Sequence, residues 1–202
     1  MSISLDTLGT GLAGMQHMRG WSGGSVLGAG LNLGMRLVIV GVVAHALRHK
    51  DDPRYAGKAI GTRGLTVVAA SLLVPALQLT IRRGERYPLA TDSLYLSIFA
   101  LDLAGNFGDL YDRHKHFDLI PHFHGTGAAS VVLAILLRRP LLAGIGIAQI
   151  AHVGLEAQEY YSDVLFGLRN VRGTWDTVND LLAGAAGSIV YAWIAHRLWR
   201  RR

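Results

Sequence analysis

The sequence predicts an all-α, polytopic membrane helix bundle of about six transmembrane helices, and three observations support this fold class. Half of the 202 residues are hydrophobic, only 17% are charged, and the mean hydropathy is +0.30. The charges gather in short clusters between apolar runs, each long enough to cross a bilayer, which takes about 20 residues per helix. The 25 glycines suit close packing of helices in lipid. We expect a lead-in segment at 1–25 and a single transmembrane helical domain at 26–202.

The charge and the residue types that are missing narrow the class of protein further. The net charge is +6 and the isoelectric point is about 10.0. Arginine pairs flank the apolar segments, so membrane lipids are the expected partners of this charge, and nucleic acid is not. The chain has no cysteine, which excludes disulfides, thiolate nucleophiles and Cys-ligated metals. Residues 1–18 have no basic stretch followed by a compact apolar core, so we expect no signal peptide there.

The first two membrane helices are predicted at about 26–47 and 64–81. Arg36 lies inside the first, and such a costly charge should face protein or reach the membrane surface. Asp51-Asp52-Pro53 breaks the polar loop between the two helices. Pro75 predicts a kink in the second helix, because proline removes a backbone hydrogen bond.

The third and fourth helices, at about 92–111 and 121–137, flank the most polar segment of the chain. Asp102, Asn106 and Asp109 have the spacing i, i+4, i+7 and are expected on one face of the third helix. The following segment, 109–125, contains four histidines and three carboxylates, namely His114, His116, His122, His124, Asp109, Asp112 and Asp118. Pro121 suits the first turn of the fourth helix.

The last two helices are predicted at about 141–160 and 176–196. Four polar residues of the fifth helix fall within an arc of roughly 80°: Gln149, His152, Glu156 and Glu159. In the sixth helix, Asp176 and Asp180 continue along one face to Gly184 and Gly187, where a neighbouring helix can approach closely.

Helix parity places the loops 48–63, 111–121 and 161–175 on one side of the membrane. A polar centre is therefore expected there, formed by Asp109, Asp112, Asp118, His122, Glu156, Glu159, Asp176 and Asp180. Three interpretations stay open. The first is a structural ion-pair network with Arg113, Lys115, Arg169 and Arg172. The second is a divalent metal site for zinc, iron or manganese, and the third is acid/base catalysis without a metal.

The candidate metal ligands are His116, His122, His124, His152, Glu156 and Glu159. Histidines two residues apart on a helix point about 200° away from each other, so the His-x-His pairs are poor chelators. His152 and Glu156, at i and i+4, are the better-placed pair.

Asp118-Leu-Ile-Pro-His122-Phe123 resembles the Asp-x-x-x-His-Phe signature that opens a helix in VanZ-like membrane proteins. That signature is followed by a glutamate one helix later, an arginine in the next loop, and an Asp/Asn-containing start to a glycine-rich last helix. Glu156, Arg169 or Arg172, and 176–180 take those places here. The Trp175-Asp176-Thr177 pattern is closer still to the YjdF-like inner-membrane proteins. The resemblance covers about residues 95–190 and implies an integral membrane protein, in one branch linked to glycopeptide-antibiotic tolerance. Leu119 replaces the usual lysine, and His124 is additional.

These observations support three hypotheses on function. The first is an enzyme that acts on a lipid or lipid-linked envelope precursor, with His122, Asp118, Glu156 and Asp176 as catalytic residues or ligands, and with Arg169, Arg172, Trp175 and Asp180 binding substrate. The second is a non-catalytic binding or assembly protein with a structural ion-pair network, and the third is a proton-coupled transporter.

The location is predicted to be the inner membrane. Basic residues are almost equally frequent on both sides, but the tail Arg197, Arg200, Arg201 and Arg202 favours cytoplasmic termini.

Overall fold

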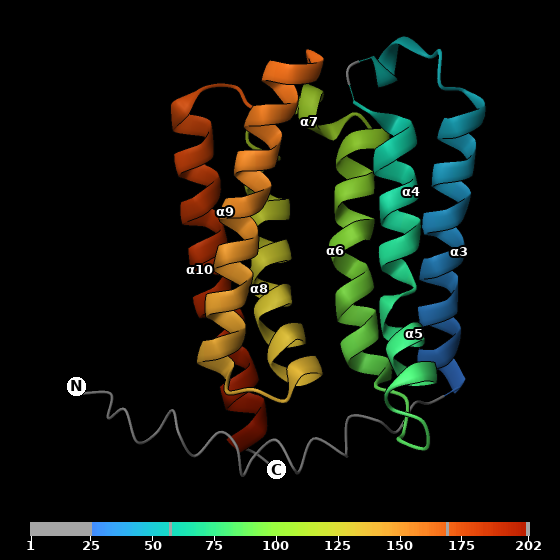
Figure 1. Cartoon of the computed structure of the whole chain (residues 1–202), viewed down its shortest axis with the longest axis vertical. Helices are drawn as coiled ribbons and strands as arrows, with labels where there is room; N and C mark the ends of the chain where they lie inside the picture. The colour runs from blue at the N-terminus through green and yellow to red at the C-terminus, as the bar shows by residue number, and fades with distance from the viewer. Residues whose placement is uncertain (1–25, 57, 169, 201–202) are drawn as a thin grey trace.

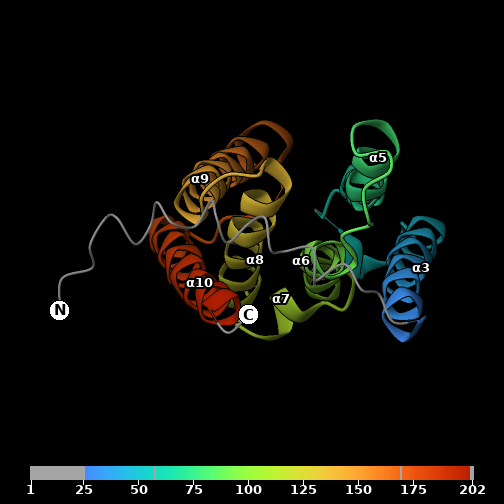
Figure 2. The ribbon, with the colours of Figure 1, turned by 90° about the horizontal axis from the view of Figure 1, so that it is seen from below.

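The computed structural model describes residues 26–56, 58–168 and 170–200, and for residues 199 and 200 it describes the backbone alone. Its long helices run along one common direction and form two groups that meet where α6 packs against α8 (Figures 1 and 2). The elements are α3 (Val26–Arg48), the 3-10 helix η2 (Pro53–Tyr55), α4 (Ile60–Ser71), α5 (Leu73–Thr80), α6 (Leu89–Phe107), α7 (Leu110–Arg113), α8 (Leu119–Leu137), α9 (Leu141–Phe166) and α10 (Thr174–Arg200). The predicted all-α fold class is confirmed.

Four helical segments are long and apolar enough to cross a membrane: Val26–Arg48, Ile60–Thr80, Leu119–Leu137 and Thr174–Leu198. Large apolar side chains cover the outer surface of the bundle. Leu31 on α3 is 64% exposed and Ile189 on α10 is 69% exposed. Water would not favour such a surface, whereas hydrocarbon would. Membrane crossing by α6 and α9 stays a prediction.

Arg36 of α3 faces protein, which is one of the two arrangements that the sequence predicts for it. Its Nη2 atom lies 2.7 Å from Asp92 Oδ2 at the start of α6. The Asp92 side chain is fully buried and also accepts a hydrogen bond of 2.6 Å from the Tyr87 hydroxyl. A buried charge is tolerable only when it is paired and hydrogen-bonded in this way, so this pair fixes α3 against α6.

The second predicted helix is interrupted at Leu72, between α4 and α5. Pro75 has no N–H with which to bond the carbonyl of residue 71, four positions earlier. Arg36 Nε donates to that carbonyl, that of Ser71, at 3.3 Å. The helix is thus interrupted in the turn before Pro75, where the sequence predicts a kink, and a neighbouring helix supplies the donor that proline lacks.

The third predicted helix ends earlier than expected, at Phe107. Asp109 has a left-handed backbone (φ +61°) and begins the short helix α7. The prediction that Asp102, Asn106 and Asp109 share one helical face is therefore wrong for Asp109. Asn106 does lie beside Asp102, with Nδ2 to Oδ1 at 2.9 Å. Asp109 instead bonds Lys58, at 2.9 Å from Nζ to Oδ1.

Helices α8, α9 and α10 form the more tightly packed group. A Cβ atom on Gly187 would come within 1.9 Å of the Phe123 carbonyl oxygen of α8, and one on Gly144 within 2.2 Å of the Ser130 carbonyl oxygen. Only glycine allows the backbones to approach so closely. The close approach predicted at Gly184 and Gly187 is confirmed.

Gly187→Ala is expected to lower the free energy of unfolding by about 1–3 kcal/mol, the usual cost of overpacking. Gly146→Ala is the matched control, because nothing lies within 4 Å of a Cβ at that position. Thermal unfolding in detergent checks the difference. Equal midpoints for the two variants would contradict a tight α8–α10 contact.

The connections that carry most of the polar residues lie at one end of the bundle. The loop with η2, the segment with α7, and the α9–α10 connection are together there (Figure 1). The start of α3 and the end of α10 lie at the other end. This is the arrangement predicted from helix parity.

Candidate metal centre

A cavity of about 650 Å³ lies between the two groups of helices, near the end of the bundle that carries the polar connections. Helices α4, α6, α8 and α9 supply its walls. Asp118, His122, His152 and Glu159 line its polar part, together with Arg63 of α4. The cavity thus joins residues that are distant in sequence around one set of ionisable groups.

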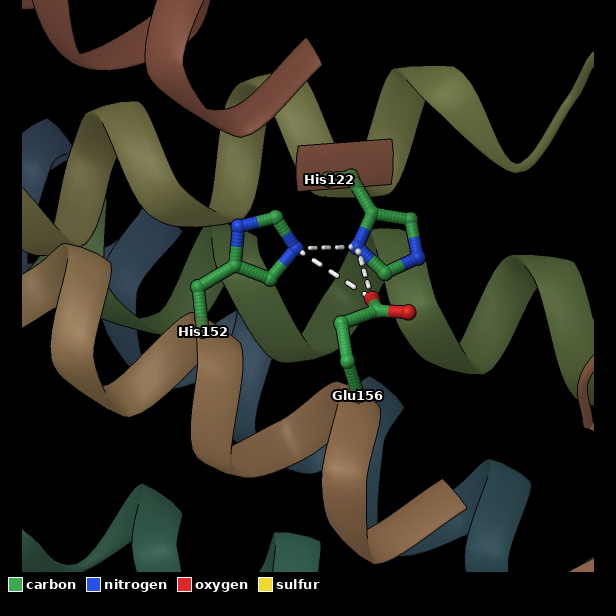
Figure 3. Close-up of side chains that lie close together, drawn as sticks. All are labelled: His122, His152 and Glu156. Atoms are coloured by element: carbon green, nitrogen blue, oxygen red, sulfur yellow. Dashed lines mark hydrogen bonds and ion pairs between the residues drawn. The ribbon is translucent and has the colours of Figure 1, made fainter. Parts of the chain in front are cut away.

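His122, His152 and Glu156 point toward one another inside the bundle (Figure 3). His122 Nδ1 lies 2.8 Å from His152 Nε2, and Glu156 Oε1 lies 3.5 Å from the first nitrogen and 3.4 Å from the second. All three residues are buried. One carboxylate oxygen and two ring nitrogens therefore form a triangle with one short side, between the two nitrogens.

Local helix geometry explains how the sequence builds this triangle. His152 and Glu156 are four residues apart on α9, so their side chains lie on one face. His122 lies near the start of α8, which packs against α9. The i, i+4 pair that the sequence favours is thus completed by the histidine of the Asp-x-x-x-His segment.

The three atoms fit the ligands of a divalent metal. Ligand atoms bound at about 2.0–2.1 Å to a tetrahedral metal lie about 3.3–3.4 Å apart, and the two distances from Glu156 Oε1 match this value. The two ring nitrogens are at hydrogen-bond distance from each other and would move about 0.5 Å apart to share a metal. Two histidines and one glutamate are a known protein ligand set for zinc. Glu156 Oε1 is buried without a hydrogen-bond partner among the described residues. A buried carboxylate oxygen without a donor is costly, and a bound cation would satisfy it.

The other side of the His122 ring faces two carboxylates. Its Nε2 lies 3.3 Å from Asp118 Oδ1 and 3.9 Å from Asp180 Oδ2. A histidine ligand commonly donates its second ring N–H to a carboxylate, which fixes the tautomer and leaves the first nitrogen free for the metal. Asp118 and Asp180 are placed for this role. The His122 ring thus connects the triangle on one side with these two carboxylates on the other.

Gly184 of α10 brings a third helix against the centre. A Cβ atom there would lie 2.3 Å from His152 Nδ1 and 2.9 Å from Thr126 Oγ1. The glycine therefore leaves space for the His152 ring in its observed position. Gln149, which precedes His152 by about one turn of α9, donates to the Ser188 hydroxyl at 2.7 Å and so holds α9 against α10.

The remaining predicted metal ligands lie apart from the triangle. His116 is exposed in the connection after α7. His124 lies on another face of α8, where Nε2 is 2.9 Å from Ser97 Oγ and Nδ1 is 2.6 Å from the Tyr191 hydroxyl. It joins α6, α8 and α10. Glu159 lines the cavity but does not belong to the triangle.

The predicted catalytic and substrate-binding residues of the last connection also lie outside the triangle. Asp176 accepts a hydrogen bond from the Arg172 backbone N–H at 2.8 Å. Trp175 is 78% exposed and does not line the cavity among the residues described. Arg172 does line it, and its guanidinium donates to the carbonyl oxygens of Tyr111 and Lys115. Arg169 lies outside the described residues.

Lys58 and Arg63 belong to this end of the bundle, where the sequence places the loop 48–63, but they were not predicted as site residues. Lys58 Nζ contacts Asp109 at 2.9 Å and Asp112 at 2.5 Å. The hydrogen bond from Lys58 holds the pKa of Asp109 below its ordinary value. Burial lowers the pKa of Lys58, but the two carboxylates more than offset burial, so its pKa is raised. Their place on the polar side of the chain was the available signal for a role in the site.

Comparisons with known proteins give no match to any family model, curated protein or solved structure.

Proposed function

We propose that this protein is a membrane-embedded, metal-dependent enzyme that acts on a lipid or lipid-linked substrate. The observation that carries the proposal is the buried triangle of His122 Nδ1, His152 Nε2 and Glu156 Oε1 at the wall of a cavity. Zinc is the metal that this ligand set favours, and iron or manganese are the alternatives. The surrounding apolar helix surfaces place the cavity within reach of lipids.

Three protein ligands leave a fourth position on a tetrahedral metal for water or for a substrate oxygen. A metal held by these residues would lower the pKa of a bound water and would polarise an ester or phosphoester oxygen. In hydrolysis, the water oxygen bonds to the carbonyl carbon or the phosphorus, and the departing alcohol takes up a proton. Glu159 lines the cavity and forms no ion pair within the described chain, so it is our candidate for moving that proton.

The placement of cations argues against a purely structural ion-pair network at the centre. Among the described residues, Asp118, Glu156 and Asp180 have only histidines within ion-pair distance. The lysine and arginine pairs within the described residues lie elsewhere, at Asp52, Glu85, Asp92, Asp102, Asp109 and Asp112. A purely structural network would instead pair the acids of the centre with the predicted cations, but Arg113 pairs with Asp109 and the Arg172 guanidinium donates to backbone carbonyls.

We further propose that α6 and α9 cross the membrane with the four apolar spans, which gives six crossings. Helix α9 supports this view, because its polar residues face the cavity while Ile150 is 75% exposed and Val153 is 54% exposed on its outer side. We place both termini in the cytoplasm and the centre near the outer face of the inner membrane. Membership of the VanZ-like and YjdF-like proteins is part of the same proposal and rests on the quoted motifs alone.

Metal analysis of protein purified without chelators tests the proposal. About one equivalent of zinc, iron or manganese is expected per chain, and its removal by a chelator should lower the thermal midpoint, with recovery after the metal is returned. A deletion strain should be rescued by the wild-type gene and not by a Glu156→Ala variant.

Each outcome of this test has a clear meaning. Two equivalents would show that the Asp118, His122 and Asp180 group binds a second ion. A metal-free chain under all loading conditions would contradict the metal centre. Full rescue by a Glu156→Ala protein that has lost its metal would contradict the enzyme and leave a structural metal site.

A further inference from the structure

The cavity changes character along its length. Near the polar connections it is lined by Lys58, Arg63 and Arg172, whereas toward the middle of the bundle it is lined by apolar side chains such as Val67, Phe99 and Leu155. His152 and Glu156 flank Leu155 on α9, so the metal centre borders the apolar region. A ligand that fills the whole cavity must therefore be an amphiphile, with a charged end and a hydrocarbon end.

The cations at the polar end favour an anionic group. Within the described chain, the Arg172 guanidinium has no carboxylate partner and donates only to two backbone carbonyls. The ion pair of Arg63 is long, 3.4 Å from Nη1 to Asp102 Oδ1, and its other nitrogen donates to Asn170 Oδ1 at 3.2 Å. Guanidinium groups with unused hydrogen-bonding capacity are suited to phosphate, which accepts two parallel hydrogen bonds.

The apolar end opens sideways rather than along the bundle axis. Its lining includes exposed residues of both α4 and α9, among them Thr66 and Ala151. A molecule in the surrounding membrane could therefore reach the metal centre without passing through water.

The centre lies below the ends of the helices that form it. His122 is the fourth residue of α8 and Asp180 is six residues into α10, which places them about 5–10 Å below those helix ends at 1.5 Å per residue. Helix α8, with 19 residues, is about as long as the hydrocarbon core is thick. The centre therefore lies within the depth of the core, so the linkage of a lipid reaches it only when the head group enters the cavity.

We propose that the cavity binds one phosphorylated lipid, with its phosphate at Arg63 and Arg172 and its hydrocarbon chain leaving between α4 and α9. This inference rests on the proposed function and names its substrate class. The linkage next to the phosphate would then lie beside the His122, His152 and Glu156 triangle. The arginines bind and orient this lipid, and they take no part in bond breaking.

Native mass spectrometry of the metal-loaded protein, released from detergent, tests the inference with three probes. The first is phosphatidic acid as a phosphonate analogue with ether-linked chains, in which neither the chain linkages nor the bond to phosphorus can be hydrolysed. The second is the matching dialkylglycerol, which lacks the phosphate, and the third is glycerol phosphate, which lacks the chains. We expect the phosphatidic acid to bind more tightly than either of the others by a factor of about 10 or more.

Two pairs of variants locate the site. Arg63→Gln and Arg172→Gln should weaken phosphatidic acid binding by a factor of about 10, whereas Arg83→Gln, an exposed arginine beyond the end of α5, should leave it unchanged. Ala151→Phe should block the exposed cavity wall, whereas Ala157→Phe, exposed on the same helix but outside the described lining, should not. Metal content is measured on every sample.

The outcomes separate this inference from the proposed function. Metal-loaded protein that binds the dialkylglycerol as well as the phosphatidic acid, or that ignores Arg63→Gln and Arg172→Gln, overturns the phosphorylated lipid and leaves the metal centre. Tight binding of glycerol phosphate alone overturns the lipid chain. Selective lipid binding by a protein that never takes up a metal supports the inference and overturns the metal-dependent enzyme.

Discussion

Asp92→Asn is expected to lower the free energy of unfolding by about 3–5 kcal/mol, the cost of removing one partner from a buried ion pair. Asp92 is fully buried, and its two oxygens accept hydrogen bonds of 2.8 and 2.7 Å from Arg36 Nη2. The neutral amide would leave the Arg36 charge without a counterion. Since whole domains are stable by only about 5–15 kcal/mol, this variant should have a much lower thermal midpoint in detergent and a poor yield.

An exposed pair of the same length provides the control. Arg54 Nη2 also lies 2.7 Å from its partner, Asp52, but the two side chains are 47% and 27% exposed. Arg54→Gln is expected to leave the thermal midpoint unchanged, because solvent screens the pair. The hydrogen bonds from Arg54 keep the pKa of Asp52 at about 2, yet an exposed shift of this kind carries little stability.

A double variant separates the charge from the packing. Arg36→Met combined with Asp92→Leu removes both charges together, and it should be more stable than Asp92→Asn. The Ser71 carbonyl, which receives no hydrogen bond from Pro75, would still lose the one that it receives from Arg36. Full recovery of wild-type stability is therefore not expected. A double variant as unstable as the single one would show that packing of these side chains, rather than pairing of charge, holds α3 against α6.

The polar end of the bundle was predictable because it depends on helix count and on spacing within single helices. Parity alone places the connections after α3, α6 and α9 together. The i, i+4 spacing of His152 and Glu156 fixes their common face whatever the neighbouring helices are. The position of His122 within the first turns of α8 likewise follows from Pro121, which suits a helix start.

The partners across helices were not predictable, because they depend on rotation and depth of separate helices. Spacing could not show that His122 presents Nδ1 to α9 and Nε2 to Asp118 and Asp180. The left-handed backbone at Asp109 also escaped prediction, since a non-glycine residue rarely adopts it. That reversal turns Asp109 toward Lys58 and removes it from the predicted stripe.

The α9 helix shows how a local contact overrides an expected boundary. It continues to Phe166 instead of ending near residue 160. Asp163, in its last turn, accepts hydrogen bonds of 2.9 and 2.8 Å from the backbone N–H groups of Asn170 and Val171. This carboxylate folds the connection back over the helix end, where Asn170 meets Arg63. A single carboxylate near a helix end does not by itself predict that the following connection folds back over the helix.

His152→Ala is expected to weaken zinc binding by more than about 100-fold, beyond the range of about 10–100-fold for residues that only orient a ligand. His152 Nε2 is one of three atoms in the triangle, and its loss leaves only His122 Nδ1 and Glu156 Oε1. Asp118→Asn, which alters the carboxylate beside His122 Nε2, should fall within the lower range. Competition with a chromogenic chelator measures the affinity in each case.

His124→Ala is the matched control for His152→Ala, because it removes the same side chain from a partly buried position outside the triangle. His124 contacts Ser97 and Tyr191, so its loss should lower the thermal midpoint without weakening zinc binding. The loss of zinc affinity should be largest in His152→Ala, because His152 contacts the metal. It should be smaller in Asp118→Asn, because Asp118 only orients the His122 ring, and it should be absent in His124→Ala, because His124 has no part in the site. Equal losses of zinc in His124→Ala and His152→Ala would show that general destabilisation, and not a ligand at His152, controls the metal.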